Sequence, residues 1–375
     1  MSHTDPLAHV RDLFDLDDEV VYLDGNSLGA PPRNVAERVQ DVIANQWGRR
    51  LIRGWSEGWW TAPERVGDRV GRLVGAAPGQ VVVADSTSVN LFKALMAAVR
   101  GTDRAEIVVD AGTFPTDGYV ARSVAELSGL ALRPVDPEHL DPTDATAVVL
   151  LNHVDYRTGR LLDMAEATER VHAVGAKVVW DLCHSVGVLP IELDRLGVDL
   201  AVGCTYKFLN GGPGSPAFLY VPKDAQADFH QPLTGWTGHR EPFAMSTDYT
   251  PDDGVSRARV GTPDIISMLA LDAALDVWDQ VDLADVRAKG LALTAHFRGL
   301  VEGLPGIEVI TPADERRGHQ VSLRHPDAKA LMDRLAERRV IGDHRPPDVL
   351  RFGFAPLYNT FEDAERAAAA LEGLL

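Results

Sequence analysis

A lysine set between a short apolar run and a glycine-rich turn is the feature that most constrains this sequence. In the stretch 199–214, apolar residues that start at position 200 predict a buried strand, Lys207 follows in a turn, and a glycine cluster ends the stretch. Because Tyr206 and Phe208 flank it, we expect this lysine to be partly desolvated, with the pKa of its amine lowered toward that of a nucleophile. A lone lysine at a strand end would by default point into water. The assignment of Lys207 as a nucleophile therefore needs support from elsewhere in the chain.

A second buried run supplies that support. Residues 178–180 are apolar, and the carboxylate of Asp181 and the imidazole of His184 follow directly. In an open α/β sheet, ligand-binding groups gather beyond the carboxyl ends of the strands. A pyridoxal 5'-phosphate enzyme needs a lysine for the cofactor's aldehyde and a carboxylate that keeps the pyridinium nitrogen protonated, so that the ring can act as an electron sink. Lys207 and Asp181 supply that pair.

A Ser/Thr-rich turn upstream could hold the phosphate of such a cofactor. The apolar residues 80–84 predict a strand, and residues 86–88 (Ser-Thr-Ser) open a predicted helix that runs to about residue 99. Hydroxyl groups and unpaired backbone N–H groups at the positive end of a helix favour an anion. Serine and threonine are also ordinary helix caps. The preceding strand and the lysine downstream favour the phosphate cradle.

Length and charge narrow the class of protein. A chain of 375 residues is expected to form more than one domain, since single cores stop growing at about 250–300 residues. The formal charge of −18 argues against nucleic acid or an anionic membrane as partner. The only cysteines, Cys183 and Cys204, lack the spacing of a metal site or a disulfide framework, which favours small core residues and a reducing cytoplasm. We find neither a signal peptide nor an apolar stretch long enough for a membrane span.

Several motifs in combination resemble one family. The segments 181–184, 205–214 and 233–239 are similar to those of kynureninase, a fold-type I pyridoxal phosphate hydrolase, and the similarity extends from 23–32 to 351–359. The resemblance implies an α/β fold with a mainly parallel sheet and a smaller α+β C-terminal domain. Strand, helix and strand over 145–180 agree with a parallel sheet. We predict an N-terminal segment, 1–45, packing with the small domain, a cofactor-binding domain, 46–264, and the small domain, 265–375.

The resemblance also implies a set of cofactor-binding residues. These are Thr87, Ser88, Phe114, Asp117, Asn152, Asp181, His184, Tyr206, Lys207, Trp236 and Thr262. Thr87 and Ser88 would hold the phosphate, and Phe114 would stack on the pyridine ring. The loops that carry Trp236 and Thr262 would reach the cofactor across a dimer interface, which makes a homodimer the expected assembly.

The implied reaction is hydrolysis of L-kynurenine or 3-hydroxy-L-kynurenine to alanine and anthranilate or 3-hydroxyanthranilate. Lys207 would serve as the base at Cα, Tyr206 would transfer protons in the late steps, and Asp181 would keep the pyridinium charged. Arg351 would bind the α-carboxylate of the small aromatic amino acid, because a guanidinium matches a carboxylate bidentately.

Other functions compete with this one. A class V aminotransferase, or another pyridoxal phosphate lyase acting on a different aromatic amino acid, would share the cofactor chemistry. A desulfurase needs a catalytic cysteine on a mobile loop, and no cysteine follows Cys204. A scaffold that keeps the fold without catalysis is disfavoured, because the lysine, aspartate, histidine and arginine are all present.

Two departures from the family pattern bear on the substrate. A predicted helix over 35–54 runs into Trp55, Trp59 and Trp60, which could line a pocket for a planar ring or pin a domain interface. This region has Ser56 and a shortened loop, and Thr262 replaces the family's usual asparagine. The preference between kynurenine and its hydroxylated form therefore stays open.

Overall fold

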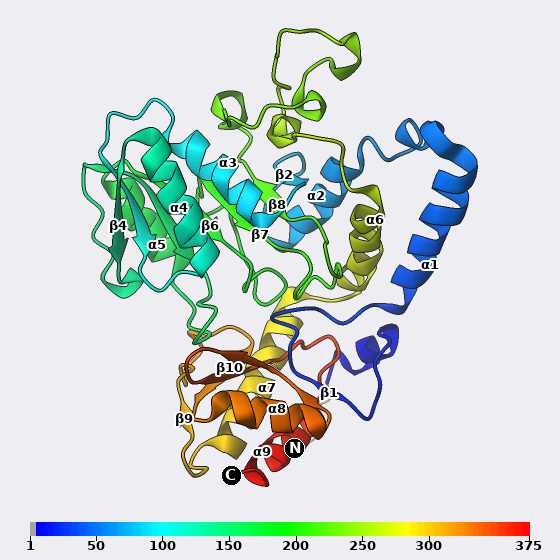
Figure 1. Cartoon of the computed structure of the whole chain (residues 1–375), viewed down its shortest axis with the longest axis vertical. Coiled ribbons are helices and arrows are strands. Elements are labelled where there is room, and N and C mark those ends of the chain that lie inside the picture. Colours follow the sequence, from blue (N-terminus) through cyan, green and yellow to red (C-terminus); the bar gives the residue numbers. More distant parts are fainter. Residues whose placement is uncertain (1–4) are drawn as a thin grey trace.

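Two units stacked along the long axis make up the molecule (Figure 1). The computed structural model describes residues 5–375. The upper unit is built on a seven-stranded sheet and the lower unit on a four-stranded sheet. The N-terminal segment and the C-terminus both lie in the lower unit.

The large sheet is mainly parallel, as predicted. Its strand order is β2-β8-β7-β6-β5-β3-β4. The strands are β2 Val81–Val83, β3 Glu106–Asp110, β4 Ala131–Val135, β5 Thr146–Asn152, β6 Lys177–Asp181, β7 Leu200–Gly203 and β8 Phe218–Tyr220. Only β8 runs against its neighbours, β2 and β7. The alternation of side chains sends Val178 and Trp180 into one apolar cluster and Val179 into the other, so both faces of the sheet are buried.

Helices cover both faces of this sheet. The helices of this unit are α1 Arg33–Asp41, α2 Ala62–Leu73, α3 Thr87–Val99, α4 Pro115–Ser128, α5 Met164–Ala173 and α6 Ile265–Ala274. Residues of α3 and α4 belong to the cluster that contains Val179, whereas α2, α5 and α6 contribute to the cluster that contains Trp180. Helices α2 to α6 therefore bury their apolar sides against the sheet or against a helix that rests on it, whereas α1 has no buried residue and contacts α6.

The lower unit has its own core. Its antiparallel sheet has the order β12-β13-β10-β9, with β9 Glu308–Val309, β10 Gln320–Arg324, β12 Asp343–Arg345 and β13 Val349–Gly353. Its helices are α7 Leu283–Val301, α8 Ala328–Glu337 and α9 Phe361–Glu372. The rings of Phe297, Phe352 and Phe354 pack together at its centre. The observed architecture is the predicted α/β fold with a smaller α+β C-terminal unit.

The N-terminal segment pairs with the lower unit. Strand β1 Val21–Tyr22 lies parallel to β11 Val340–Ile341. The first four residues of the predicted segment 1–45 lie outside the described residues. Helix α6, directly after the predicted boundary at residue 264, contacts α1 and α2 of the upper unit, and α7 leads into the lower unit. The exact domain boundaries remain a prediction.

The predicted helix over 35–54 changes type along its length. The α-helix ends at Asp41, a π-helical segment follows at Val42–Arg50, and a 3-10 segment follows at Leu51–Trp55. We name residues 33–55 the arm, because they project at the side of the upper unit (Figure 1). None of the helices within residues 5–375 has the length and apolarity that a membrane span requires.

Candidate active site

The strand register brings three of the predicted site residues to one edge of the large sheet. Asn152 on β5 is opposite Asp181 on β6, and Asp181 is opposite Val202 on β7. The turn after β7 then carries Lys207. Since parallel strands end at the same edge, the amide, the carboxylate and the amine meet beyond their carboxyl ends.

The amine of Lys207 contacts a histidine. Its Nζ lies 3.0 Å from Nε2 of His184. Burial acts to lower the pKa of Lys207, but the neighbouring thiols, the Tyr206 phenol and the Asp181 carboxylate outweigh burial and raise that pKa above its ordinary value. The sequence-based prediction of a lowered lysine pKa is therefore wrong. It considered desolvation without the acidic groups that the fold gathers around the amine.

His184 is held in its neutral form. Burial, then the positive charge of Lys207, then that of Arg351 place the pKa of the imidazole well below its usual range. With Nε2 accepting from the Lys207 ammonium, the ring proton sits on Nδ1, which is buried and has no partner in the part of the chain that the structure describes. Such an unpaired buried donor beside a reactive amine is a mark of a binding site.

Asp117 and Asp181 form a coupled acid pair. Burial, and then the Asp181 charge, raise the pKa of Asp117 well above its ordinary value, so Asp117 carries the proton of the pair. The Asn152 amide donates to Oδ2 of Asp117 at 2.9 Å, and the backbone N–H of Cys183 donates to Oδ1 of Asp181 at 2.6 Å. These bonds fix the positions of both carboxyl groups.

The start of α3 faces a cavity. Ser86 caps the helix by accepting from the N–H of Val89, and Thr87 is the first helical residue. Behind this turn, the fully buried amine of Lys93 donates to the Asp85 carboxylate and, at 2.8 Å, to the carbonyl of Ala258. Lys93 thus connects the turn before α3 to the segment around Ala258, which leads into the Arg259 side of the cavity.

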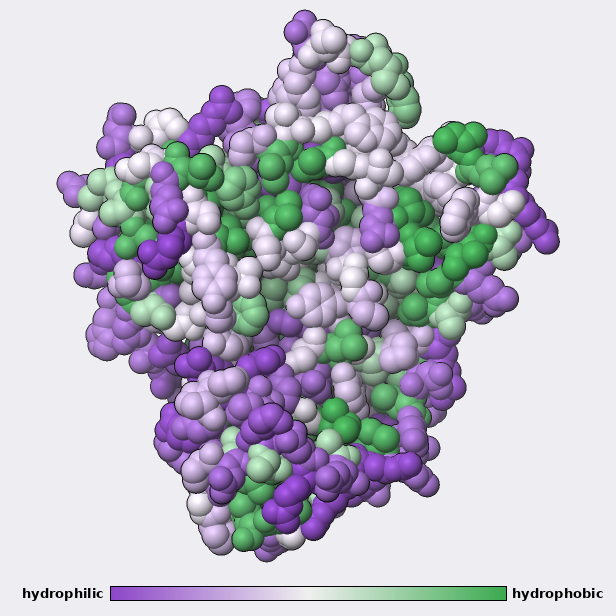
Figure 2. All heavy atoms as spheres, viewed as in Figure 1, coloured by the Kyte–Doolittle hydropathy of each residue, from purple (hydrophilic) through white to green (hydrophobic). Residues whose placement is uncertain are grey.

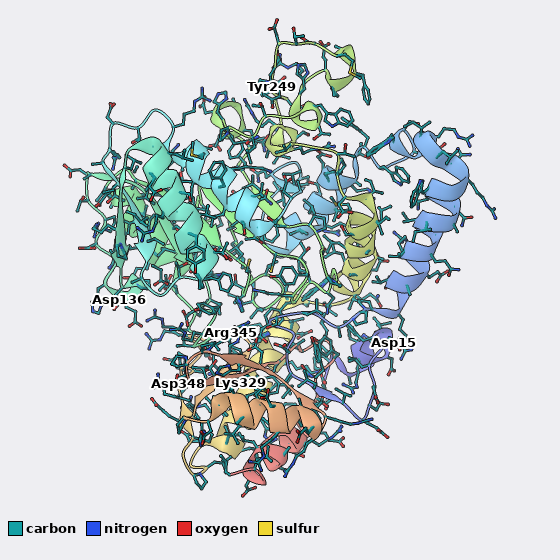
Figure 3. All side chains as sticks on the ribbon, in the orientation of Figure 1. Asp15, Asp136, Tyr249, Lys329, Arg345 and Asp348 are labelled. Carbon is teal, nitrogen blue, oxygen red and sulfur yellow. The ribbon has the colours of Figure 1, made fainter. Side chains whose placement is uncertain are left out.

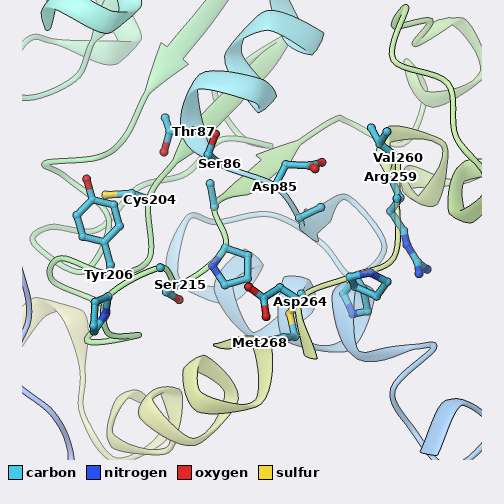
Figure 4. A pocket seen from close by; sticks show the side chains of 18 of the residues that line it. Asp85, Ser86, Thr87, Cys204, Tyr206, Ser215, Arg259, Val260, Asp264 and Met268 are labelled. Carbon is cyan, nitrogen blue, oxygen red and sulfur yellow. The ribbon is translucent and has the colours of Figure 1, made fainter. Parts of the chain in front are cut away.

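The cavity has a volume of about 610 Å³, within the range of small-molecule sites. Figure 4 shows Ser86 and Thr87 on one side of it, with Tyr206 and Cys204 nearby and Arg259 on the far side. Thr262 belongs to the same wall as Arg259. Three predicted residues, Thr87, Tyr206 and Thr262, therefore line one cavity.

Two predicted aromatic residues are placed differently. Phe114, at the start of α4, is part-exposed, and its ring contacts the ring of Tyr156 edge-on at 5.2 Å. Trp236 is also part-exposed, and its ring packs against that of Trp60 in a tilted arrangement, with 5.2 Å between the ring centroids. Among the described residues, the contacts of Trp236 join it to this aromatic group rather than to the Lys207 cluster. Ser88 lies in the first turn of α3.

Arg351 is fully buried, and other residues already occupy its guanidinium. Its Nε donates to Oδ1 of Asp343 at 2.6 Å, and its Nη2 donates to the other carboxylate oxygen and to Ser27. Its Nη1 donates to the carbonyl of Tyr156. Arg351 on β13 and Asp343 on β12 are register partners, which explains the bidentate pairing.

Sequence reasoning did not find several residues of this site. Thr113 donates to Oδ1 of Asn152 at 2.5 Å, and Cys183, read from sequence as a core residue, lies 3.8 Å from the Thr87 hydroxyl. Lys93 and Asp343 were not singled out either. Lys93 follows Asn90 by three residues, so the two lie on one face of the helix. The other buried residues of this helix are apolar, and a lysine among them was a usable sequence signal.

Solved structures with this fold define its class. The cysteine desulfurase CsdA of Escherichia coli superposes with a TM-score of 0.85 at 20% identity, covering 99% of this chain and 98% of that one. The cysteine desulfurase of Thermococcus onnurineus NA1 also gives 0.85 at 20% identity, over 100% and 98%. The fold is therefore that of the fold-type I pyridoxal phosphate enzymes.

Sequence relatives identify the family. A kynureninase of Deinococcus radiodurans is 48% identical over 99% of this chain and 94% of its own length. A kynureninase of Burkholderia pseudomallei is 47% identical over 100% and 94%. Residues 286–371 match the kynureninase C-terminal domain. The chain belongs to the kynureninase family, its cofactor is pyridoxal phosphate, and the sequence-based identification is confirmed.

The residues present fit this cofactor. The amine of Lys207 contacts His184, whose Nδ1–H has no partner among the described residues, and Asp181 ends the strand beside β7. The hydroxyls of Ser86 and Thr87 start a 13-residue helix that faces the cavity. An aldehyde-bearing heterocycle with a phosphate group matches this donor set, because amine, carboxylate and anion cradle are all supplied.

Proposed function

We propose that this enzyme hydrolyses the Cβ–Cγ bond of L-kynurenine or 3-hydroxy-L-kynurenine, releasing alanine and anthranilate or 3-hydroxyanthranilate. The observation that carries the proposal is the convergence of Lys207, His184 and the Asp117–Asp181 pair at one sheet edge, in a chain of the kynureninase family. Pyridoxal phosphate, when bound, supplies an electron sink that makes the bonds at the substrate's Cα and Cβ labile.

Asp181 is the residue that would hold the pyridine nitrogen in its protonated state. The Cys183 N–H donates to its Oδ1 at 2.6 Å, and burial and then its charge raise the pKa of the neighbouring Asp117. Asn152 in turn donates to Asp117, which orients the protonated carboxyl group. The two carboxyl groups are therefore held in fixed positions at the strand ends, where we propose that the pyridine nitrogen binds.

Lys207 and Tyr206 are the residues proposed to move protons. Lys207 would take the Cα proton at Nζ, with His184 accepting from the same nitrogen and fixing its position. Burial, followed by the charge of Cys204, raises the pKa of Tyr206 to about 12, so its phenol remains a proton donor at neutral pH. Tyr206 lines the cavity, which suits a donor to the departing groups.

The cofactor's phosphate would bind at the start of α3, to Thr87 and Ser88. We retain Phe114, Trp236 and Thr262 as proposed cofactor contacts. We propose that Arg351 binds the α-carboxylate of the substrate. Its Nη2 donates to Ser27, which lines the cavity.

We further infer a homodimer. The arm exposes Ile43, Trp47, Leu51 and Ile52, with exposed fractions from 46% to 76%. Figure 2 shows hydrophobic residues gathered at the right of the molecule, over the arm. Apolar residues at this density favour burial against a second copy. The two unpaired thiols agree with a proposed cytoplasmic setting.

Product analysis tests the function. Purified holoenzyme is incubated with L-kynurenine and, separately, with 3-hydroxy-L-kynurenine, and the aromatic amine and alanine are quantified. Equal amounts of alanine and of anthranilate or 3-hydroxyanthranilate are expected. A keto acid with aminated cofactor would identify an aminotransferase instead, and the absence of any aromatic amine would refute the proposal.

A further inference from the structure

The two cysteines of the sequence, Cys183 and Cys204, lie beside each other at the strand ends. Cys183 is the second residue after β6 and Cys204 is the first after β7, and these parallel strands pair Asp181 with Val202. Continuing that register places Cys183 opposite Cys204, and neighbouring strands lie about 4.8 Å apart. A disulfide needs Cα atoms roughly 4.4–6.8 Å apart. The backbone therefore holds the two cysteines at a separation that a disulfide can span.

The two side chains also meet. The backbone N–H of Cys204 donates to Sγ of Cys183 at 3.2 Å, and Sγ of Cys204 lies 3.7 Å from the carbonyl oxygen of Cys183. Each sulfur thus contacts the backbone of the other residue, and both thiols are free. A bond between the sulfurs therefore needs a movement of side chains and not a rearrangement of strands.

This thiol pair is open to the cavity. Cys204 lines the cavity (Figure 4). Cys183 is part-exposed, and its Sγ lies 3.8 Å from the hydroxyl of Thr87, which lines the same cavity. A small oxidant that enters the cavity can therefore reach a sulfur atom.

The surroundings favour a thiolate on Cys204. Burial acts to raise the pKa of Cys204, but the hydrogen bond with Cys183 and the charge of Lys207 outweigh burial and lower that pKa. The hydrogen bond with Cys204, and then burial, raise the pKa of Cys183 well above its ordinary value. Because the thiolate is the form that peroxides oxidise, Cys204 is the expected attacking sulfur and Cys183 the resolving thiol.

We propose that Cys183 and Cys204 form an oxidation site for hydroperoxides, which convert the pair to a disulfide that reversibly inactivates the enzyme. The Cys204 sulfur attacks one peroxide oxygen, the O–O bond breaks, and a sulfenic acid forms while the other oxygen leaves as water. The Cys183 sulfur then attacks the Cys204 sulfur, the S–O bond breaks, and a second water leaves. Two thiols and one hydrogen peroxide thus give one disulfide and two waters, with two electrons passing from sulfur to oxygen.

The disulfide acts on the site because both cysteines belong to segments that carry site residues. The N–H of Cys183 donates to Asp181 at 2.6 Å, and His184 follows Cys183 directly. Cys204 precedes Lys207 by three residues. Covalent contact between the sulfurs draws these two segments together, and a displacement of about 1 Å at a reacting centre costs up to about 100-fold in rate. We expect turnover to fall by at least about tenfold for this reason.

Peptide mapping of peroxide-treated holoenzyme tests the pair directly. The enzyme is treated with hydrogen peroxide, the peroxide is removed with catalase, and remaining thiols are blocked before digestion with trypsin without reductant. The expected product joins peptides 178–195 and 196–207, which contain one cysteine each, with the loss of two hydrogens. Turnover and the absorbance of the cofactor are recorded on the same samples. Both should change with disulfide formation and return with dithiothreitol.

Variants show whether the thiol pair is responsible. Cys183→Ala and Cys204→Ala, each compared with its own untreated sample, should retain turnover after peroxide, because neither can form the disulfide. Met268→Leu is the control, since Met268 is an oxidisable side chain that also lines the cavity. It should remain as sensitive to peroxide as the wild-type enzyme.

Several outcomes would overturn the proposal. These are oxidation of either cysteine without an intramolecular disulfide, resistance of both thiols to peroxide, and a disulfide that leaves turnover and cofactor absorbance unchanged. Inactivation that persists in both alanine variants, or that dithiothreitol does not reverse, would also overturn it. Failure of the proposed function would appear separately, as the absence of anthranilate from untreated enzyme with L-kynurenine, and the peptide map with the cofactor absorbance would then still decide the role of the thiol pair.

Figure 3 gives the setting of this site among the other side chains of the molecule. The labelled Asp136, Asp15, Lys329 and Asp348 lie toward the outside of the view, whereas the strand ends that carry the thiol pair belong to the interior of the upper unit. Access to the pair is therefore through the cavity, and a hydroperoxide small enough to enter it is the oxidant that the mapping experiment uses.

Discussion

Nζ of Lys207 lies 3.0 Å from Nε2 of His184, a neutral imidazole whose other nitrogen has no partner in the described chain. This contact fixes the position of the amine, because Nε2 is the ring nitrogen that can accept from the Lys207 ammonium. The raised pKa of Lys207 agrees with an ammonium that donates to His184. The site thus holds its amine in place before any ligand arrives.

The acid pair predicts unequal effects of two similar substitutions. The raised pKa of Asp117 favours its neutral form, so Asp117→Asn is expected to reduce kcat/KM by no more than about tenfold. Asp181→Asn removes the charge that the pyridine nitrogen needs, and we expect a loss of about 100-fold or more. Steady-state kinetics and cofactor titration of both variants measure the contrast. Equal losses would mean that the proton is not on Asp117.

Removing Arg351 is expected to destabilise the protein as well as to impair the site. Arg351→Met leaves Asp343 and the Tyr156 carbonyl without their main donor, and loss of one partner of a buried ion pair costs about 3–5 kcal/mol. Urea unfolding measures this change. Combining it with Asp343→Leu should recover part of the loss, because no uncompensated charge remains. If the free energy of unfolding of Arg351→Met lies within about 1 kcal/mol of the wild-type value, the pair is not structurally important.

Asp24 predicts a pH-dependent stability. Burial and the Asp343 charge raise the pKa of Asp24 from 3.8 to about 6. The folded state therefore retains a proton that the unfolded chain has lost, so the contribution of Asp24 to the free energy of unfolding is full below about pH 4 and is lost as pH rises through 6. The free energy of unfolding of Asp24→Asn, relative to that of wild type, should rise by about 2–3 kcal/mol between pH 4 and pH 7.5. The exposed Asp144→Asn is the control, and a pH-independent difference for Asp24→Asn would contradict the assignment.

The apolar arm predicts an assembly that one charge can disrupt. Ile52→Asp places a carboxylate on the exposed surface of the arm, and we expect the sedimenting species to change from dimer to monomer. Leu127→Asp, at an equally apolar and exposed position on α4, should leave the assembly unchanged. A dimer that persists in Ile52→Asp would show that the arm lies outside the interface.

Residues that follow strands could be predicted from sequence, whereas their partners could not. Buried apolar runs located Asp181 and Lys207, because a strand end in a parallel sheet is readable from a local pattern. The contact of Ser27 with Asp343 spans 316 positions, and no local pattern encodes such a pairing. The direction of the Lys207 pKa shift failed for the same reason, since it depends on groups that only the fold brings near. The arm also departed from the predicted helix, which gives way to π and 3-10 segments after Asp41.

The most direct test is to find which amine carries the cofactor. Holoenzyme is reduced with borohydride, digested, and mapped by peptide mass. The account predicts a pyridoxyl group on the peptide containing Lys207, and its loss, together with loss of activity, in Lys207→Ala. A pyridoxyl group on another lysine, such as Lys177 at the start of β6, or an active Lys207→Ala enzyme, would contradict it.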